Sequence, residues 1–140
     1  SINMRLYNVR GRLQSKNVNK YLIDWDAKCK SKIQKKVKDF FKTYWENHVV
    51  YEEFPVFGTR LKVDLLNATK RIAVEVQGQQ HTSYSKFFHG SRTGYWKSIK
   101  RDVTKEDWLI ANEFKLVEVN FDEVDSLSKE FAEEQYGIIL

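Results

Sequence analysis

Apolar residues recur at helical spacing from about Ser31 onward, and this stretch predicts the first helix of the chain. The apolar positions follow one another at intervals of three and four residues, as on one face of an α-helix: Ile33, Val37, Phe40, Phe41 and Tyr44. Four basic residues lie largely outside this stripe: Lys32, Lys35, Lys36 and Lys42. We therefore expect one face of the helix to pack on a core and the basic face to meet solvent.

The pattern then changes to the alternation that is typical of strands. His48–Phe54 is predicted as the first strand, and Leu61–Leu66 as the second. The turn-like segment Asn67–Lys70 leads into a third strand, Ile72–Gln77. The second and third strands are close enough in sequence to form a hairpin.

The remainder of the chain adds a helix, a strand and a further helix. A polar, aromatic loop is expected from Gln79 to about Lys97, followed by a helix over Ser98–Asn112. Lys115–Phe121 is a further strand, and the acidic stretch Asp122–Glu134 predicts a closing helix. Ser1–Asn19 carries basic residues, no acidic ones and little periodicity, so we interpret it as an extended arm or a poorly ordered terminus.

This order of elements predicts an α/β fold with a mixed sheet of about four strands flanked by helices. A chain of 140 residues is the size of one domain, and no repeat or linker divides it. We divide the predicted domain, 1–140, into a basic extension (1–30), a core (31–121) and a C-terminal helix (122–140).

The distribution of charge changes the picture more than the net charge of +5 does. Residues 1–50 hold 12 Lys and Arg against 4 Asp and Glu, whereas residues 51–140 hold 12 against 15. The first third of the chain is therefore the candidate for binding a polyanion such as DNA. A solvated helix face is the alternative interpretation of the same residues.

The single cysteine, Cys29, excludes an intrachain disulfide and a cysteine-rich zinc site. No apolar run is long enough for a membrane span or a signal peptide. We expect an intracellular protein, from the cytoplasm of a bacterial or phage-infected host cell, without a membrane partner.

Two acids on the predicted hairpin are the candidates for chemistry. Asp64 lies on the second strand, and Glu75 lies on the third, where it shares a face with Gln77. Two neighbouring carboxylates that are partly buried repel each other unless a cation lies between them, so the pair indicates a site for a hard metal ion. The alternative is that both acids face solvent on the outer side of the hairpin.

The strand order and these acids resemble the PD-(D/E)xK nuclease superfamily, whose metal-binding acids lie on the second and third strands of its core. The resemblance implies a restriction-endonuclease-like core (α-β-β-β-α-β), Mg²⁺ or Mn²⁺ as cofactor, and Asp64, Glu75 and Val76 at the metal. This chain departs from the basic pattern because Gln77 stands where the motif has lysine.

A closer resemblance covers roughly residues 31–120. It is to phage-type homing endonucleases and very-short-patch-repair-like proteins with an EDxHD pattern. The matching segments are Glu53–Asp64, Ala73–His81 and Arg101–Lys105 before Phe114. The resemblance implies that Glu53, Asp64, His81 and Asp102 supply the pattern, with Gln34 as an alternative to Glu53.

Four of these residues also have ordinary structural interpretations. Gln34 lies three residues after Ser31, a spacing that fits a capping box as well as it fits a site role. Asp102 and Lys105 lie one helical turn apart, so they form either a simple ion pair or part of the acid cluster with a lysine for phosphate. His81 is either a general base or an exposed loop residue.

The resulting hypothesis is an endonuclease that hydrolyses double-stranded DNA with Mg²⁺ or Mn²⁺, in which a homodimer or higher homo-oligomer makes any double-strand cut. The alternatives are a DNA-binding module without activity and a branched-DNA (Holliday junction) resolvase. Candidate catalytic residues are Asp64, Glu75, Gln77, His81, Asp102, Glu53, Lys105 and Gln34. Candidate DNA-binding residues are Arg10, Arg12, Lys16, Lys32, Lys35, Lys36, Arg60, Lys86, Arg92, Lys97 and Arg101.

Overall fold

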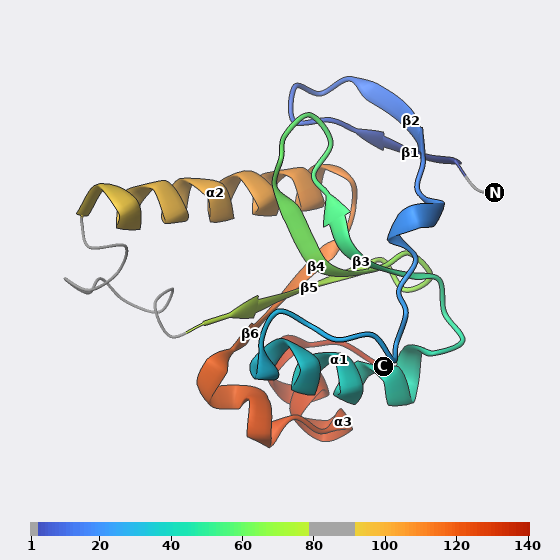
Figure 1. Cartoon of the computed structure of the whole chain (residues 1–140), viewed down its shortest axis with the longest axis vertical. Coiled ribbons are helices and arrows are strands. Elements are labelled where there is room, and N and C mark those ends of the chain that lie inside the picture. The colour runs from blue at the N-terminus through green and yellow to red at the C-terminus, as the bar shows by residue number, and fades with distance from the viewer. Residues whose placement is uncertain (1–2, 79–91) are drawn as a thin grey trace.

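The computed structural model describes residues 3–78 and 92–140, and within them a four-stranded mixed sheet lies at the centre, in the order β3-β4-β5-β6 (Figure 1). Its strands are Val50–Pro55 (β3), Lys62–Asn67 (β4), Ile72–Gln77 (β5) and Lys115–Asn120 (β6). β4 runs antiparallel to β3 and β5, whereas β5 and β6 are parallel. The expected α/β class with a mixed sheet is confirmed, and each strand lies within two residues of its predicted bounds.

One face of the sheet is covered by helix α1 (Lys32–Trp45) and by the C-terminal turns (Figure 1). The helix begins where predicted, because the Ser31 hydroxyl accepts the main-chain N–H of Gln34 at 3.1 Å. Val37, Phe41 and Trp45 are fully buried, with the rings of Phe41 and Trp45 stacked at 4.2 Å, whereas the other apolar residues of the stripe are half-buried. This stripe packs in one cluster with residues of all four sheet strands, among them Leu65, Val74 and Val117.

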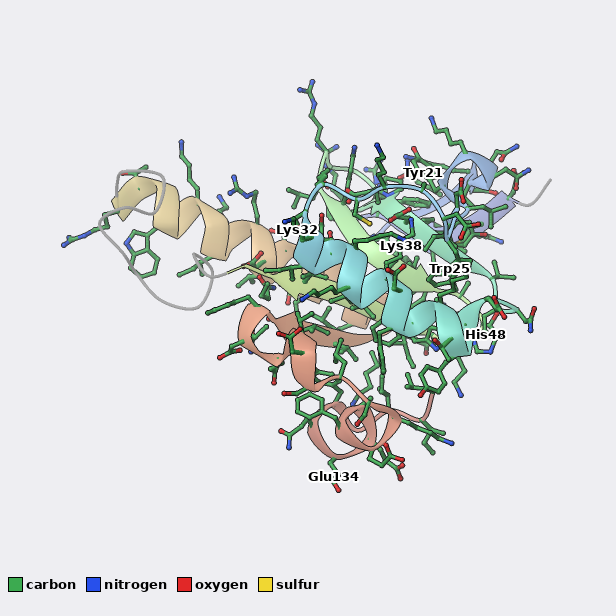
Figure 2. All side chains as sticks on the ribbon, turned by 60° about the horizontal axis from the view of Figure 1, so that its bottom comes forward. Tyr21, Trp25, Lys32, Lys38, His48 and Glu134 are labelled. Atoms are coloured by element: carbon green, nitrogen blue, oxygen red, sulfur yellow. The ribbon has the colours of Figure 1, made fainter. Side chains whose placement is uncertain are left out.

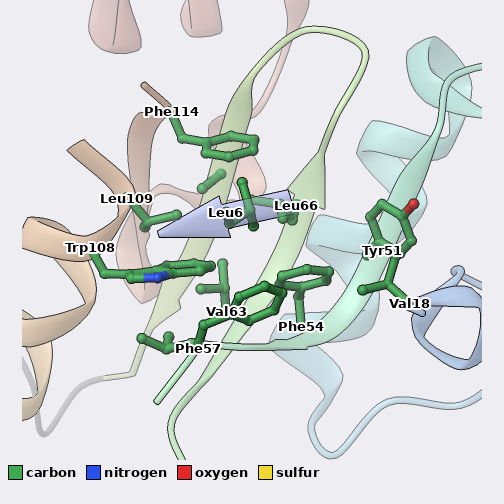
Figure 3. Packing of buried hydrophobic residues seen from close by; sticks show 12 residues of the cluster. Leu6, Val18, Tyr51, Phe54, Phe57, Val63, Leu66, Trp108, Leu109 and Phe114 are labelled. Carbon is green, nitrogen blue, oxygen red and sulfur yellow. The ribbon is translucent and has the colours of Figure 1, made fainter. Parts of the chain in front are cut away.

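The other face is covered by helix α2 (Arg92–Ala111) and by a hairpin of two further strands, β1 (Asn3–Tyr7) and β2 (Leu13–Asn17). The core here is aromatic: Trp108 of α2 packs against Phe54 and Phe57, with ring centroids 6.3 and 5.9 Å away (Figure 3). Since Phe57 lies in the loop between β3 and β4, this cluster fixes that loop against α2.

The prediction of an extended N-terminal arm is wrong. The segment folds as the β1-β2 hairpin, whose turn is held by the Asn8 side chain accepting the N–H groups of Arg10 and Arg12 at 2.9 and 3.1 Å. Leu6 is buried in the aromatic core, as is Val18 directly after β2. Two short strands with few inward-facing apolar residues carry too weak a periodic signal to be recognised from sequence.

Helix α2 begins six residues earlier than predicted, at Arg92. Its first turns project from the domain (Figure 1), and Trp96 there is exposed, so no apolar periodicity marks them. Gly94 also opposes helix formation, at a cost of about 1 kcal/mol. In the described part of the chain, neither α2 nor any other helix is long and apolar enough to cross a membrane.

The single closing helix predicted after β6 is also wrong. The chain forms a 3₁₀ helix, η3 (Phe121–Ser126), a single α-turn, α3 (Lys129–Phe131), and a π-turn, η4 (Ala132–Tyr136). Two N-caps divide the segment, because Asn120 caps η3 and the Ser128 hydroxyl caps α3. Val124, Ala132 and Ile138 are thereby buried on α1 and the sheet, which one straight helix would not achieve.

We predict that Asn112→Ala lowers the free energy of unfolding by about 2–4 kcal/mol. The Asn112 amide accepts the N–H of Tyr7 at 2.8 Å and donates to the carbonyls of Tyr7 and Trp108 at 3.1 and 3.0 Å, so it joins the hairpin to the end of α2. Urea unfolding measures the change. The control is Ile110→Ala, at an exposed position in the last turn of α2, which should alter stability by less than about 0.5 kcal/mol. Equal effects of the two substitutions would contradict this account.

Candidate active site

The candidate site lies where β4 and β5 separate. Their ladder pairs Asn67 with Ile72, Leu66 with Ala73 and Leu65 with Val74, and it ends there. Beyond that point two carboxylates take the place of main-chain carbonyls. Glu75 Oε2 accepts the N–H of Asp64, and Asp64 Oδ2 accepts the N–H of Val76, both at 2.8 Å.

These two hydrogen bonds bring both acids together at the end of the ladder. The β4-β5 register, continued by one pair, sets Asp64 opposite Glu75, and opposed residues of antiparallel strands share a face. The interpretation that both acids simply face solvent on the outer side of the hairpin does not hold, since Glu75 is only 5% exposed.

A bend in the neighbouring strand β3 interrupts the β3-β4 ladder at Asp64. Glu53 has a left-handed backbone, with φ of 51°, and it forms no ladder pair with Asp64 although the residues on both sides of it pair with β4. Tyr51 and Phe54 consequently enter the same core cluster although they are three residues apart, which strict strand alternation would forbid. The Glu53 carboxylate itself pairs with Lys30 at 3.3 Å.

The electrostatics of the pair are unfavourable without a cation or proton between the acids. Burial and the Glu75 carboxylate raise the pKa of Asp64 to about 8. The Lys105 ammonium, from α2, lies 2.7 Å from Glu75 Oε1. Burial opposes the charge of that ammonium, but the Glu75 and Asp64 carboxylates outweigh it and hold the pKa of Lys105 above its usual value.

Gln34 lies at the helix start and contacts the acid pair, but its side chain does not return to Ser31 to complete a capping box. Its main-chain N–H is capped by Ser31, as expected for a helix start, and its side-chain amide reaches across to Asp64 Oδ1 at 3.2 Å. Gln34 therefore contacts the acid pair directly. Glu53 acts on the pair through its charge, which also raises the pKa of Asp64.

The donor atoms at this point fit a hard divalent ion with a small protein ligand set. Asp64 and Glu75 supply carboxylate oxygens, and Val76 adds a carbonyl on the same edge, because the N–H and C=O of a strand residue point the same way. Mg²⁺ commonly keeps several waters and takes one or two carboxylates. Among the described residues no group of three His, Cys, Asp or Glu is placed to hold a metal, so such an ion would rest on this set and water.

A cavity of about 390 Å³ opens beside Asp64, and we call it the basic cavity. Asp102 and Glu53 line it, together with five basic side chains: Lys30, Arg60, Lys62, Arg101 and Lys105. The structure thus brings Asp102 and Lys105 to the same cavity as Asp64. Lys30 and Lys62 were not predicted as site residues. Lys62 lies two residues before Asp64 on β4, and this spacing could have identified it.

The side chain of Gln77 does not make the contact with the acid pair that its predicted catalytic role requires. Its side-chain amide donates to Glu118 Oε2 at 3.3 Å, across the parallel β5-β6 pair, and not to Asp64 or Glu75. Burial, with Asp102 and Glu106 nearby, raises the pKa of Glu118, and this favours a partner that can hydrogen-bond in either protonation state. His81 and Lys86 lie outside the described residues.

The predicted DNA-binding residues that the structure describes fall into four groups. Arg60 and Arg101 lie at the basic cavity, and five others are exposed on the hairpin, α1 and α2: Arg10, Arg12, Lys32, Arg92 and Lys97. Lys16 lies over the Phe57 ring at 4.7 Å. Lys35 and Lys36 pair with Asp39 and Asp125 at 2.6 and 3.2 Å, as the alternative of a solvated helix face predicts.

We predict that without divalent ions the wild type loses stability, relative to Asp64→Asn, as the pH rises. The folded protein keeps a proton on Asp64 up to about pH 8, whereas the unfolded chain releases it near pH 4. Between these values unfolding releases a proton, so the free energy of unfolding falls with pH, by a few kcal/mol in all. Asparagine keeps an acceptor for the Val76 N–H and does not titrate. Urea unfolding in EDTA across this range measures the difference, and parallel profiles would contradict the assignment.

Comparison with known proteins adds little to this geometry. No protein-family model matches the chain, and no solved structure matches it. A segment of 67 residues is 31% identical to protein 033L of Invertebrate iridescent virus 3, which is described as uncharacterized. The match covers 48% of this chain and 34% of the viral protein, so the chain spans about a third of that relative's length. The function of the site must therefore be argued from the site itself.

Proposed function

We propose that the protein is a metal-dependent endonuclease that hydrolyses phosphodiester bonds of DNA. The observation that carries the proposal is the convergence of Asp64 and Glu75 where β4 and β5 part, each carboxylate held by a main-chain N–H of the opposite strand. This arrangement fixes two oxygen ligands before any metal binds, so little reorganisation is needed to take up the ion.

A bound Mg²⁺ or Mn²⁺ would supply Lewis acidity to the phosphoryl oxygen and acidify a water. Asp64 and Glu75 would hold it with the Val76 carbonyl. Gln34 keeps the Asp64 carboxylate oriented through its hydrogen bond at 3.2 Å. Lys105 contacts the pair directly, and its ammonium can neutralise Glu75 or stabilise negative charge that develops on a phosphate in the basic cavity.

The basic cavity supports DNA as the substrate. Its five Lys and Arg side chains line the same cavity as Asp64, so the backbone of a nucleic acid would be attracted to the point where the metal would bind. The net charge of +5 acts in the same direction over a longer range. A small anionic substrate would need fewer basic side chains than the five that line this cavity.

The resemblance to the PD-(D/E)xK superfamily, and to its EDxHD members in particular, is part of the same proposal. The antiparallel, antiparallel, parallel order of the four strands, with a helix before β3 and another before β6, is compatible with a restriction-endonuclease-like core. The departure at Gln77 is offset by Lys105, which brings an ammonium to Glu75 from the helix. Cutting both strands of a duplex would require a second copy of the chain, hence a homodimer.

The second candidate is a DNA-binding module that has lost catalysis. The observation in its favour is the engagement of Gln77 with Glu118, which leaves no cation at the motif position on β5. This candidate predicts salt-sensitive DNA binding that is unaffected by EDTA and no cleavage under any metal.

We predict that the wild type cleaves or nicks supercoiled plasmid with Mg²⁺ or Mn²⁺, and that Asp64→Asn lowers the rate by about 100-fold or more. The reason is that the substitution removes the charge of the central ligand while its hydrogen bond to Val76 persists. The control is Asp26→Asn, an exposed acid paired with Lys42, which should cleave like the wild type. Cleavage that survives Asp64→Asn would remove the proposed site, and absence of cleavage with EDTA-insensitive binding would favour the second candidate.

A further inference from the structure

The β1-β2 hairpin and the residues directly after it carry positive charge that no carboxylate neutralises. Residues 3–20 contain no Asp or Glu and five basic residues: Arg5, Arg10, Arg12, Lys16 and Lys20. Within the part of the chain that the structure describes, none of these five side chains forms an ion pair. Arg10 and Arg12 in the turn and Lys16 on β2 are exposed. These charges are therefore available to an anionic partner.

Helix α1 also has five lysines, but most of their charge is already balanced. Four of them pair with carboxylates: Lys35 with Asp39, Lys36 with Asp125, Lys38 with Glu52 and Lys42 with Asp26. Lys38, which Figure 2 places between α1 and the sheet, is only 1% exposed. The positive charge that the first third of the chain can offer to a ligand is thus concentrated on the hairpin and not on α1.

The end of the molecule opposite the hairpin is acidic. Residues 121–140 contain six Asp and Glu and one lysine. Figure 1 shows this segment and the hairpin on opposite sides of the central sheet. The field of the protein therefore draws a polyanion toward the hairpin and repels it from the C-terminal turns.

The hairpin turn is bonded to the loop that leads to the basic cavity. The Val9 N–H donates to the Phe57 carbonyl at 3.0 Å, and Lys16 lies over the Phe57 ring at 4.7 Å. Gly58 follows with φ of 91°, and a Cβ atom there would come within 3.1 Å of the Val9 side chain, so the two turns touch. Arg60 lines the basic cavity, and its Cα is two residues, at most about 7 Å, from that of Gly58. The basic surface of the hairpin and the basic cavity therefore adjoin.

We propose that the β1-β2 hairpin is the surface on which duplex DNA docks, and that Arg10, Arg12 and Lys16 bind phosphates of the duplex whose cleaved bond lies in the basic cavity. This inference rests on the proposed function for its substrate. The contacts go to the sugar-phosphate backbone, so they position the DNA without reading its sequence. The lysines of α1 that are paired with acids take no part in the docking.

The surroundings of these cations favour a duplex over a single strand. Proteins that bind single strands combine a basic groove with exposed aromatic rings on which unpaired bases stack. The ring beside Lys16, that of Phe57, is fully buried, so it offers no such face. Phosphates of a duplex need only the charges, and they stand at a density of about one per 1.7 Å of helix axis.

The test measures the affinity of Arg10→Gln/Arg12→Gln for a fluorescein-labelled synthetic duplex. Fluorescence anisotropy in EDTA reports binding without hydrolysis. Both substitutions keep the main-chain N–H groups that the Asn8 side chain accepts, so the turn should fold as in the wild type. The variant should bind the duplex about 10-fold or more weakly, and the slope of log Kd against log salt concentration should fall by about two, one for each lost phosphate contact.

The matched control is Lys42→Gln/Lys129→Gln, which removes the same charge from α1 and from the C-terminal turns. Its affinity for the duplex should stay within about twofold of the wild type, because salt screens charges that are far from the bound DNA. A third variant, Lys32→Gln/Lys36→Gln, removes two charges from the basic face of α1. It should lose less affinity than Arg10→Gln/Arg12→Gln.

Equal losses in the hairpin variant and the matched control overturn the inference, because net charge alone would then explain them, and they leave the proposed endonuclease standing. A greater loss in the third variant places the duplex on α1 and overturns the inference as well. The same holds if the hairpin variant keeps the salt slope of the wild type, or if it loses affinity for the labelled single strand alone. Failure of the wild type to bind the duplex contradicts the proposed function itself.

Discussion

Two hydrogen bonds between carboxylates and main-chain N–H groups define this structure's most consequential feature. They replace the last rungs of the β4-β5 ladder, and they hold Asp64, which is half-buried, against Glu75, which is only 5% exposed. Strand pairing, the aromatic core under α2 and the apolar face of α1 all serve to keep these strands in register up to that point. Burial and the repulsion between the two carboxylates raise the pKa of Asp64, and a cation would relieve that repulsion.

The central layers were predictable because their signals are strong and local. The period of the apolar residues changes from helical to alternating between residues 31 and 77, and each strand was located within two residues. The elements that were missed depend on distant partners. The β1-β2 hairpin is stable because Trp108 and Asn112, about a hundred residues away, bond to Tyr7. The C-terminal turns follow the surface of α1, which acidic composition alone does not predict.

The candidate site was predictable to a similar extent. Asp64, Glu75, Asp102 and Lys105 were identified as candidates from motif and spacing, and the structure brings them to one place. The position of Gln77 could not be inferred, because its partner Glu118 comes from a strand reached by the parallel crossover. The buried Lys38–Glu52 pair was also missed, since a lysine within a basic helix gives no sign that it is buried.

Titration of the protein with Mn²⁺ by calorimetry, in buffers of different ionisation enthalpy at pH 7, tests the central claim most directly. Because Asp64 keeps its proton up to about pH 8, metal uptake should displace it. The account predicts one ion per chain with release of about one proton, and loss of both in Asp64→Asn. Absence of binding by the wild type, or binding that releases no proton and survives the substitution, would contradict it.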